Sequence, residues 1–92
     1  MYRKDLIERL LDNPVGIGEL AAEYGLTTRA MAGELEHLRR SFRNESYRLA
    51  VLPAQCRRCG FRFDADKLTK PGKCPECRST WIQEPAVRVE RA

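Results

Sequence analysis

Two pairs of cysteines constrain this chain more than any other feature of its sequence. Two residues separate Cys56 from Cys59 and Cys74 from Cys77, and fourteen residues separate the pairs. Four thiolates at this spacing can surround one ion tetrahedrally, as in structural zinc sites with Zn–S bonds of about 2.3 Å. Gly60 follows the first pair, where the turn around a metal favours a positive φ. The pattern predicts one structural zinc ion held by all four cysteines.

Other uses of four cysteines agree less well with the sequence. Two disulfides need an oxidising compartment, and the first residues lack the pattern of a secretion signal. A redox centre uses one Cys-x-x-Cys pair rather than two at this spacing. Iron takes the same four thiolates in rubredoxins, but the chain offers no electron-transfer partner domain. Because four cysteines fill the coordination sphere, we expect no enzymatic activity at the metal.

The length of the chain limits its organisation. Its 92 residues suffice for one domain, or for two very small ones that share a core. Such a chain buries only about 60–65% of its unfolded surface, so a metal that locks part of it adds stability. No apolar run approaches the roughly 18 residues of a membrane span. We therefore expect a cytoplasmic protein without a membrane partner.

Charge is distributed unevenly along the chain. The formal net charge of +4 falls to about +2 once four thiolates bind a divalent ion. Residues 1–46 hold 7 Lys or Arg against 8 Asp or Glu, whereas residues 47–92 hold 10 against 5. The positive excess therefore lies in the half with the cysteines. Some of it can simply neutralise the metal–thiolate cluster, in particular Arg57, Arg58, Lys73 and Arg78.

Apolar residues repeat with helical spacing in the first half of the chain. Residues 2–12 predict an amphipathic helix that ends before Pro14, and residues 15–17 predict a three-residue strand. A second, short helix is predicted for residues 18–24. Gly25 then suits the position just after a helix C-terminus.

A third helix has the clearest pattern. It is predicted from Thr28 to about Phe42, with Thr27 as its N-cap. Its apolar stripe consists of Met31, Leu35, Leu38 and Phe42. Helix, glycine turn, Leu-Thr and helix together follow the pattern of a helix-turn-helix. The alternative is a plain three-helix core whose exposed face carries ordinary solvated charges.

Two segments alternate between apolar and polar residues, as strands do. They are residues 47–52 and 86–90, which flank the cysteines on either side. We predict that they pair antiparallel and that the ladder stops at the prolines next to them, because proline cannot donate a backbone hydrogen bond. The predicted opposite residues are Val51 with Val87, Leu49 with Val89 and Pro53 with Pro85.

Together these elements predict an α+β fold. Three helices and a small antiparallel sheet form a winged helix-turn-helix, and a zinc ribbon is inserted at the tip of the wing. The winged helix takes residues 1–53 and 85–92, and the ribbon takes residues 54–84. The predicted core of the ribbon is Phe61, Phe63, Leu68 and Trp81.

These motifs resemble a known family. Residues 17–38 are similar to the winged helix-turn-helix of archaeal transcription regulators. Cys56-x-x-Cys-Gly and Cys74-Pro-Glu-Cys, followed by Trp81, resemble the knuckles of rubredoxin-like zinc ribbons. In this order, they resemble the small archaeal family of predicted transcriptional regulators in which a winged helix is fused to a zinc ribbon. The resemblance covers nearly the whole chain.

The resemblance implies a DNA-binding regulatory role in which residues 28–43 are the recognition helix and the four cysteines bind zinc. The candidate DNA-contacting residues are Thr28, Arg29, Gly33, His37, Arg40 and Arg43. Two positions depart from the family pattern. Arg78 stands where the second knuckle often has glycine, so it must take an unusual φ or another turn. Gly18 stands where a Ser or Thr cap is common, which predicts a weaker helix start.

Double-stranded DNA is the expected partner, with the chain a monomer or weak homodimer. Ribbon residues Arg62, Lys67 and Lys70 are expected to contact phosphates. The negative balance of residues 1–46 argues against strong phosphate binding. It leaves open an alternative function, a protein-interaction module of a transcription or translation assembly without direct DNA readout. An exposed apolar patch favours that alternative.

Overall fold

The computed structural model describes residues 3–43, 45–64, 68–69 and 71–91, so the predicted positions Tyr2, Lys67 and Lys70 lie outside the described residues. The elements in chain order are α1 (Arg3–Leu10), β1 (Val15–Gly16), α2 (Ile17–Glu23), α3 (Thr28–Ser41), β2 (Tyr47–Leu52), β3 (Gln55–Cys56), β4 (Ile82–Gln83) and β5 (Ala86–Arg91). All predicted helices and strands are present to within two residues of their bounds, which confirms the α+β class. None of the described helices is long and apolar enough to cross a membrane.

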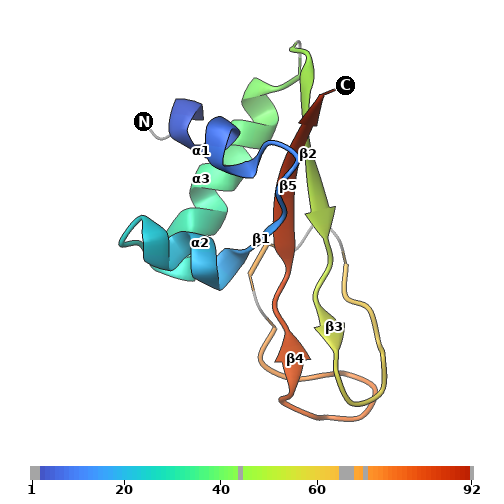
Figure 1. The fold of residues 1–92 in the computed structure, drawn as a ribbon. Helices are drawn as coiled ribbons and strands as arrows, with labels where there is room; N and C mark the ends of the chain where they lie inside the picture. The colour runs from blue at the N-terminus through green and yellow to red at the C-terminus, as the bar shows by residue number, and fades with distance from the viewer. Residues whose placement is uncertain (1–2, 44, 65–67, 70, 92) are drawn as a thin grey trace.

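A three-stranded antiparallel sheet joins the two halves of the chain. Its strand order is β1-β5-β2, so the last strand lies in the middle. The predicted register is confirmed, with Leu49 opposite Val89 and Val51 opposite Val87. The ladder stops next to the two prolines, and pairing resumes beyond them between β3 and β4. Figure 1 shows this second, two-stranded ladder at the far end of the β2–β5 pair.

The hydrophobic core lies between the three helices and one face of the sheet (Figure 1). The apolar stripe predicted for α3 is buried along its whole length. The sheet contributes Leu49, Val87 and Val89 to this core, and α1 and α2 contribute their own apolar stripes. One further member, Leu68, comes from the segment between the cysteine pairs.

The predicted core of the ribbon is wrong in two of its four residues. Phe61 and Phe63 do contact each other edge to face, with 5.0 Å between ring centroids. Leu68, however, is only 4% exposed and joins the helical core, whereas Trp81 is 63% exposed. The physical reason is that knuckle hydrogen bonds and the metal site already hold the ribbon together, so it needs few apolar contacts of its own.

The helix termini explain how α2 and α3 are joined. Gly25 has φ 67°, and the N–H of Leu26 donates to the carbonyl of Ala21 at 2.9 Å, which closes α2 with a Schellman motif. The predicted N-cap of α3 is confirmed, because the Thr27 hydroxyl accepts from the N–H of Ala30 at 3.0 Å. The turn therefore orients α3 through local hydrogen bonds.

Candidate metal centre and the adjacent basic face

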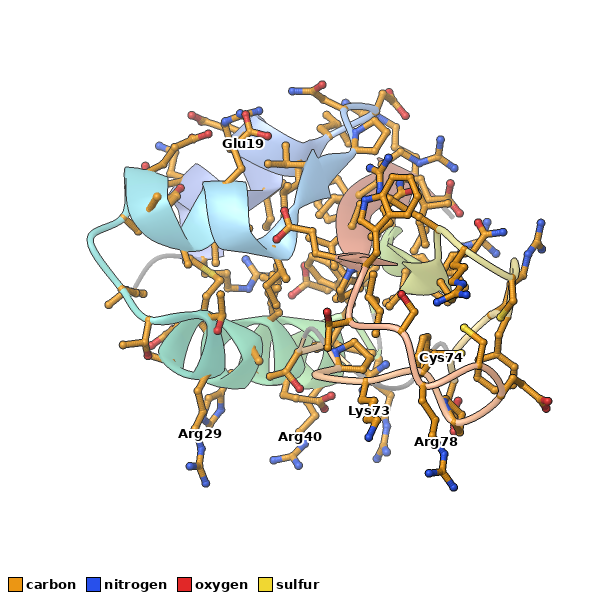
Figure 2. The ribbon with its side chains drawn as sticks, turned by 90° about the horizontal axis from the view of Figure 1, so that it is seen from below. Glu19, Arg29, Arg40, Lys73, Cys74 and Arg78 are labelled. Carbon is orange, nitrogen blue, oxygen red and sulfur yellow. The ribbon has the colours of Figure 1, made fainter. Side chains whose placement is uncertain are left out.

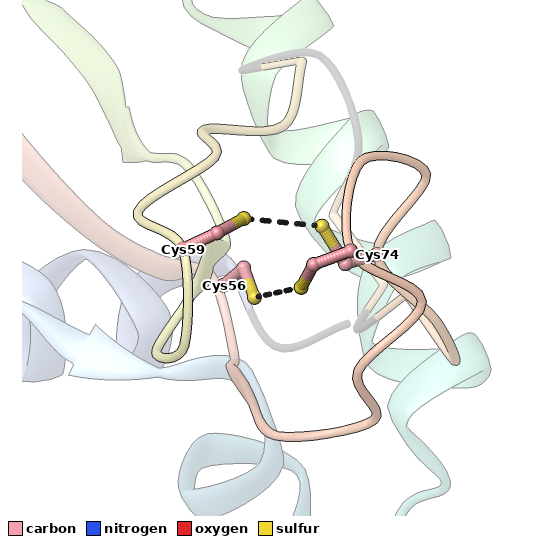
Figure 3. A group of neighbouring side chains, drawn as sticks. Cys56, Cys59 and Cys74 are labelled. Carbon is pink, nitrogen blue, oxygen red and sulfur yellow. Dashed lines mark hydrogen bonds between the residues drawn. The ribbon is translucent and has the colours of Figure 1, made fainter.

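The structure brings the four cysteine sulfurs together, as predicted. Cys56 Sγ lies 3.5 Å from Cys77 Sγ, and Cys59 Sγ lies 3.6 Å from Cys74 Sγ (Figure 3). All four sulfurs lie within 4.8 Å of one another. A tetrahedral zinc ion with Zn–S bonds of about 2.3 Å needs sulfurs about 3.8 Å apart. The four thiols therefore fit one structural zinc ion with no coordination position left open.

Two knuckles of the same shape present these sulfurs. The N–H of Gly60 donates to the carbonyl of Cys56, and the N–H of Arg78 donates to the carbonyl of Cys74, both at 2.9 Å. Each first cysteine also donates its own N–H to the carbonyl five residues later, at 2.8 and 2.9 Å. Gly60 has φ 83° and Arg78 has φ 62°. The predicted turn at Gly60 is confirmed, and Arg78 adopts the unusual φ that its place in the second knuckle requires.

The sulfurs strongly influence one another's protonation. The backbone N–H of Cys59 lowers the pKa of the Cys56 thiol to about 6. At Cys59, the backbone N–H of Phe61 lowers the pKa, but desolvation and the thiols of Cys74 and Cys77 outweigh it and raise the pKa to about 12. Four neighbouring sulfurs cannot all carry unbalanced negative charge. A divalent cation removes this conflict, so zinc binding should release protons.

Basic side chains of α3 and of the ribbon project from one side of the molecule. Figure 2 shows Arg29 and Arg40 of α3 pointing in the same direction as Lys73 and Arg78 of the second knuckle. Glu19 of α2 lies on the opposite side. We call the side with the four cations the basic face. Within the described part of the chain, none of the four forms an ion pair.

The candidate DNA-contacting residues are all exposed. Arg29 and Arg40 belong to the basic face. Arg43 lies two residues beyond Ser41, the last residue of α3, so the helix ends before the predicted bound at residue 43. A Cβ added at Gly33 would meet, among the described residues, no atom within 4 Å beyond its chain neighbours and its own helix backbone, so packing does not explain that glycine. His37 instead borders a small cleft of about 180 Å³ between α1 and α3.

Ion pairs show which charges of the first half neutralise one another, although they leave its overall balance unchanged. On α3, Glu36 is paired with Arg39. Glu23 of α2 pairs with Arg9 of α1 at 2.8 Å, and Glu45 pairs with Arg3. Each pair removes one cation and one anion, so residues 1–46 keep an excess of one negative charge, and Arg29 and Arg40 are not among the paired cations. The last two pairs join residues far apart in sequence, which local patterns could not reveal.

The ribbon cations on the basic face differ from those that the sequence predicts to contact DNA. The sequence predicts phosphate contacts for Arg62, Lys67 and Lys70, and it leaves Lys73 and Arg78 to balance the thiolates. Arg62 is exposed, and the other two lie outside the described residues. Lys73 and Arg78 are the ribbon cations that Figure 2 aligns with α3. The sequence feature that could have indicated this role is their position, because Lys73 directly precedes Cys74 and Arg78 directly follows Cys77.

Known proteins resemble this chain over both its helical part and its ribbon. Residues 53–92 match the family described as the PF0610 rubredoxin-like zinc beta-ribbon domain. The solution NMR structure of protein PF0610 from Pyrococcus furiosus is 35% identical, with a TM-score of 0.79, over 98% of this chain and 89% of that one. None of the curated proteins compared with the chain matches it. The chain therefore belongs to the family of the Pyrococcus furiosus protein PF0610, with its rubredoxin-like zinc ribbon.

Proposed function

We propose that this protein is a DNA-binding transcriptional regulator whose recognition helix is α3 and whose zinc ribbon contacts the same duplex. The observation that carries the proposal is the basic face. Arg29 and Arg40 on α3 align with Lys73 and Arg78 on the ribbon, and none of them forms an ion pair among the residues that the structure covers (Figure 2). Uncompensated cations along one side of a small protein suit a polyanion such as DNA.

The local geometry of α2 and α3 supports a helix-turn-helix. A positive-φ glycine ends α2 and a threonine caps α3, so the second helix projects from the core with an exposed outer face. In a winged helix, β2 and β5 form the wing, and the ribbon then takes the place of its tip. Arg29 and Arg40 are eleven residues apart, which corresponds to about 16 Å along the helix. Between them, Gly33 allows the helix backbone to approach the groove floor closely.

In this function the zinc ion has a structural role. Four cysteines occupy its coordination sphere, so the ion holds the two knuckles and thereby the positions of Lys73 and Arg78. No step of DNA recognition needs a reaction at the metal, and we propose no enzymatic activity. The partner is double-stranded DNA. Side chains of α3 contact its base edges, and side chains of the ribbon contact its phosphates.

Fluorescence anisotropy with random and genomic DNA fragments over a range of salt concentrations tests this function. On random DNA, one phosphate contact from each of Arg29, Arg40, Arg43, Lys73 and Arg78 is the upper limit and would give a salt slope of about 4–5 log units per decade. On a preferred site, a base contact by Arg40 removes one of these phosphate contacts. Arg40→Ala should weaken binding to a preferred site by about 1–3 kcal/mol and affect random DNA much less. Lys73→Ala should lower the slope by about one unit on every sequence.

A matched variant separates position from total charge. Lys4→Ala removes one exposed positive charge from α1, which lies on the other side of the helical layer from the basic face. It should leave both affinity and salt slope nearly unchanged. Binding that is equal on every sequence and insensitive to Arg29→Ala and Arg40→Ala would contradict a recognition role for α3.

One observation favours protein docking as a second candidate function. Trp81 is 63% exposed and Leu52 is 48% exposed, and protein docking would use these side chains as parts of one contiguous apolar patch. Under this alternative, the chain binds DNA weakly near physiological salt, and Trp81→Ala removes partner binding. Under the DNA proposal, Trp81→Ala leaves the salt slope unchanged because it removes no charge.

A further inference from the structure

Glu84 connects the zinc ribbon to the start of α2. It lies between β4 and β5, and one of its carboxylate oxygens, Oε1, accepts a hydrogen bond from the N–H of Gly18 at 3.0 Å. Gly16, the N-cap residue of α2, has no side chain that could cap the helix. The first N–H groups of a helix have no partner within the helix, so a carboxylate from elsewhere can supply one. The predicted weakness of this helix start is therefore offset by a residue 66 positions away in the sequence.

Two glycines make room for this carboxylate. A Cβ at Gly16 would lie 2.2 Å from Glu84 Oε2, and a Cβ at Gly18 would lie 2.4 Å from Glu84 Oε1. The backbone does not require glycine at the N-cap, because Gly16 has φ −64° and ψ 144°, which any residue adopts. The glycines are explained by the space that Glu84 occupies. Both segments therefore carry residues suited to this contact, a carboxylate at Glu84 and glycines at positions 16 and 18.

On the ribbon side of this contact, Glu84 lies close in sequence to a residue that pairs with a zinc ligand. In the β3–β4 ladder, Ile82 is opposite the zinc ligand Cys56, and Glu84 follows two residues later. Between Glu84 and β5, Pro85 is fully buried and its carbonyl accepts from the N–H of Ile17 at 2.9 Å. Two hydrogen bonds therefore join the residues that directly follow β4, the strand beside the zinc site, to the first turn of α2.

We propose that Glu84 is a positioning residue that couples metal occupancy of the ribbon to the start of α2, and through α2 to the placement of α3. With zinc bound, the β3–β4 ladder holds Glu84 against Gly18. Without zinc, the ladder loses its anchor at Cys56, and the carboxylate leaves the helix. Because α2 packs against α3, the change reaches the basic face. The coupling holds whatever molecule the basic face binds.

Amide hydrogen exchange of Gly18 and of the residues after it in α2 measures this coupling directly. In zinc-loaded wild-type protein, the Gly18 N–H should be protected, and removal of zinc with a chelator should reduce that protection. Glu84→Ala should speed exchange at Gly18 by about two- to tenfold with zinc still bound, the range expected for one lost hydrogen bond. Glu84→Gln keeps the acceptor and the shape of the side chain, so it should remain close to wild type.

A double variant separates coupling from simple loss of stability. In Glu84→Ala the space beside the N-cap is free, so Gly16→Ser can add a hydroxyl that accepts from the N–H of Gly18 within the helix itself. The double variant Gly16→Ser/Glu84→Ala should recover protection at Gly18, and chelation should no longer change it. Gly16→Ser alone should resemble the double variant, because its side chain displaces the carboxylate and its hydroxyl then accepts from the N–H of Gly18.

Zinc affinity gives an independent readout, because coupling is reciprocal. Competition with a chromogenic chelator should show that Glu84→Ala binds zinc about two- to tenfold more weakly, while the absorption spectrum of the cobalt-substituted site stays unchanged. The proposal is overturned if chelation leaves Gly18 protected in the wild type. It is equally overturned if chelation exposes α2 to the same extent in the wild type and in the double variant.

Discussion

Leu68→Ala tests whether the zinc ribbon and the helices share one core. Leu68 lies between the two cysteine pairs, yet it is only 4% exposed and belongs to the same cluster as the buried residues of the helices. Truncating a buried leucine to alanine lowers the free energy of unfolding by about 2–5 kcal/mol. Leu68 comes from a connecting segment, which can close on the cavity more readily than a helix. We therefore expect about 2–3 kcal/mol.

Thermal unfolding of the zinc-loaded protein, followed by far-ultraviolet circular dichroism, reports the effect on the helices. For a domain of this size, 1 kcal/mol corresponds to roughly 4–8 °C in Tm, so Leu68→Ala should lower Tm by about 10–20 °C. Leu52→Ala is the matched control, because it removes the same atoms from a side chain that is 48% exposed. Its unfolding free energy should change by no more than about 0.5 kcal/mol.

The comparison of the two variants decides the question. Zinc content should stay at one ion per chain in both, because neither residue is a ligand. If the helices of Leu68→Ala melt at the temperature of Leu52→Ala, the segment between the cysteine pairs is not part of the helical core. In that case, the ribbon would be held to the rest of the chain only by its strands and by Glu84.

Three further predictions concern the metal centre and the sheet. Cys74→Ser removes one of four thiolates, so metal analysis of protein purified under reducing conditions should find well below one zinc per chain. Arg78 has a left-handed backbone at φ 62°, which glycine adopts without strain. Arg78→Gly should therefore raise the unfolding free energy of the zinc-loaded protein by about 1 kcal/mol in denaturant titrations. No gain would mean that the knuckle holds Arg78 without strain. Hydrogen bonds from Arg48 and Arg88 hold the pKa of Glu90 below its usual range. Their stabilising effect is therefore fully present above the unfolded pKa of about 4.3, and it is lost as the pH falls through the pKa of Glu90 in the folded protein. Glu90→Gln should accordingly be less stable than wild type at pH 7, and the difference should vanish in acid.

Local patterns were sufficient to predict the elements and the sheet register. The stripe from Met31 to Phe42 and the cap at Thr27 set the bounds of α3 because both act within a few residues. The register followed from alternation together with the prolines next to both strands, since a shift of one residue would turn Leu49 and Val51 away from the core and a larger shift would bring a proline into the ladder. The four zinc ligands were predictable for a similar reason, because two short knuckles have a fixed spacing.

Contacts between distant segments could not be predicted from these patterns. Gly18 looked like a missing cap because its partner, Glu84, approaches only after the sheet has formed. Leu68 and Trp81 are both large apolar residues in the ribbon, and nothing local distinguishes the buried one from the exposed one. The ion pair of Arg9 with Glu23 likewise depends on how α1 packs beside α2. Each of these features is set by tertiary packing.

The position of the ribbon matters for the electrostatics of the proposed function. Arg29, Arg40 and Arg43 alone, if each contacted one phosphate, would give a salt slope of about 3 log units per decade. Lys73 and Arg78 extend the same face and raise the slope to about 4–5. At about 0.15 M salt, two more released counterions strengthen binding on the order of 30-fold. Because zinc holds the knuckle that contains both ribbon cations, metal loss should remove this gain and leave α3 with only weak, local contacts.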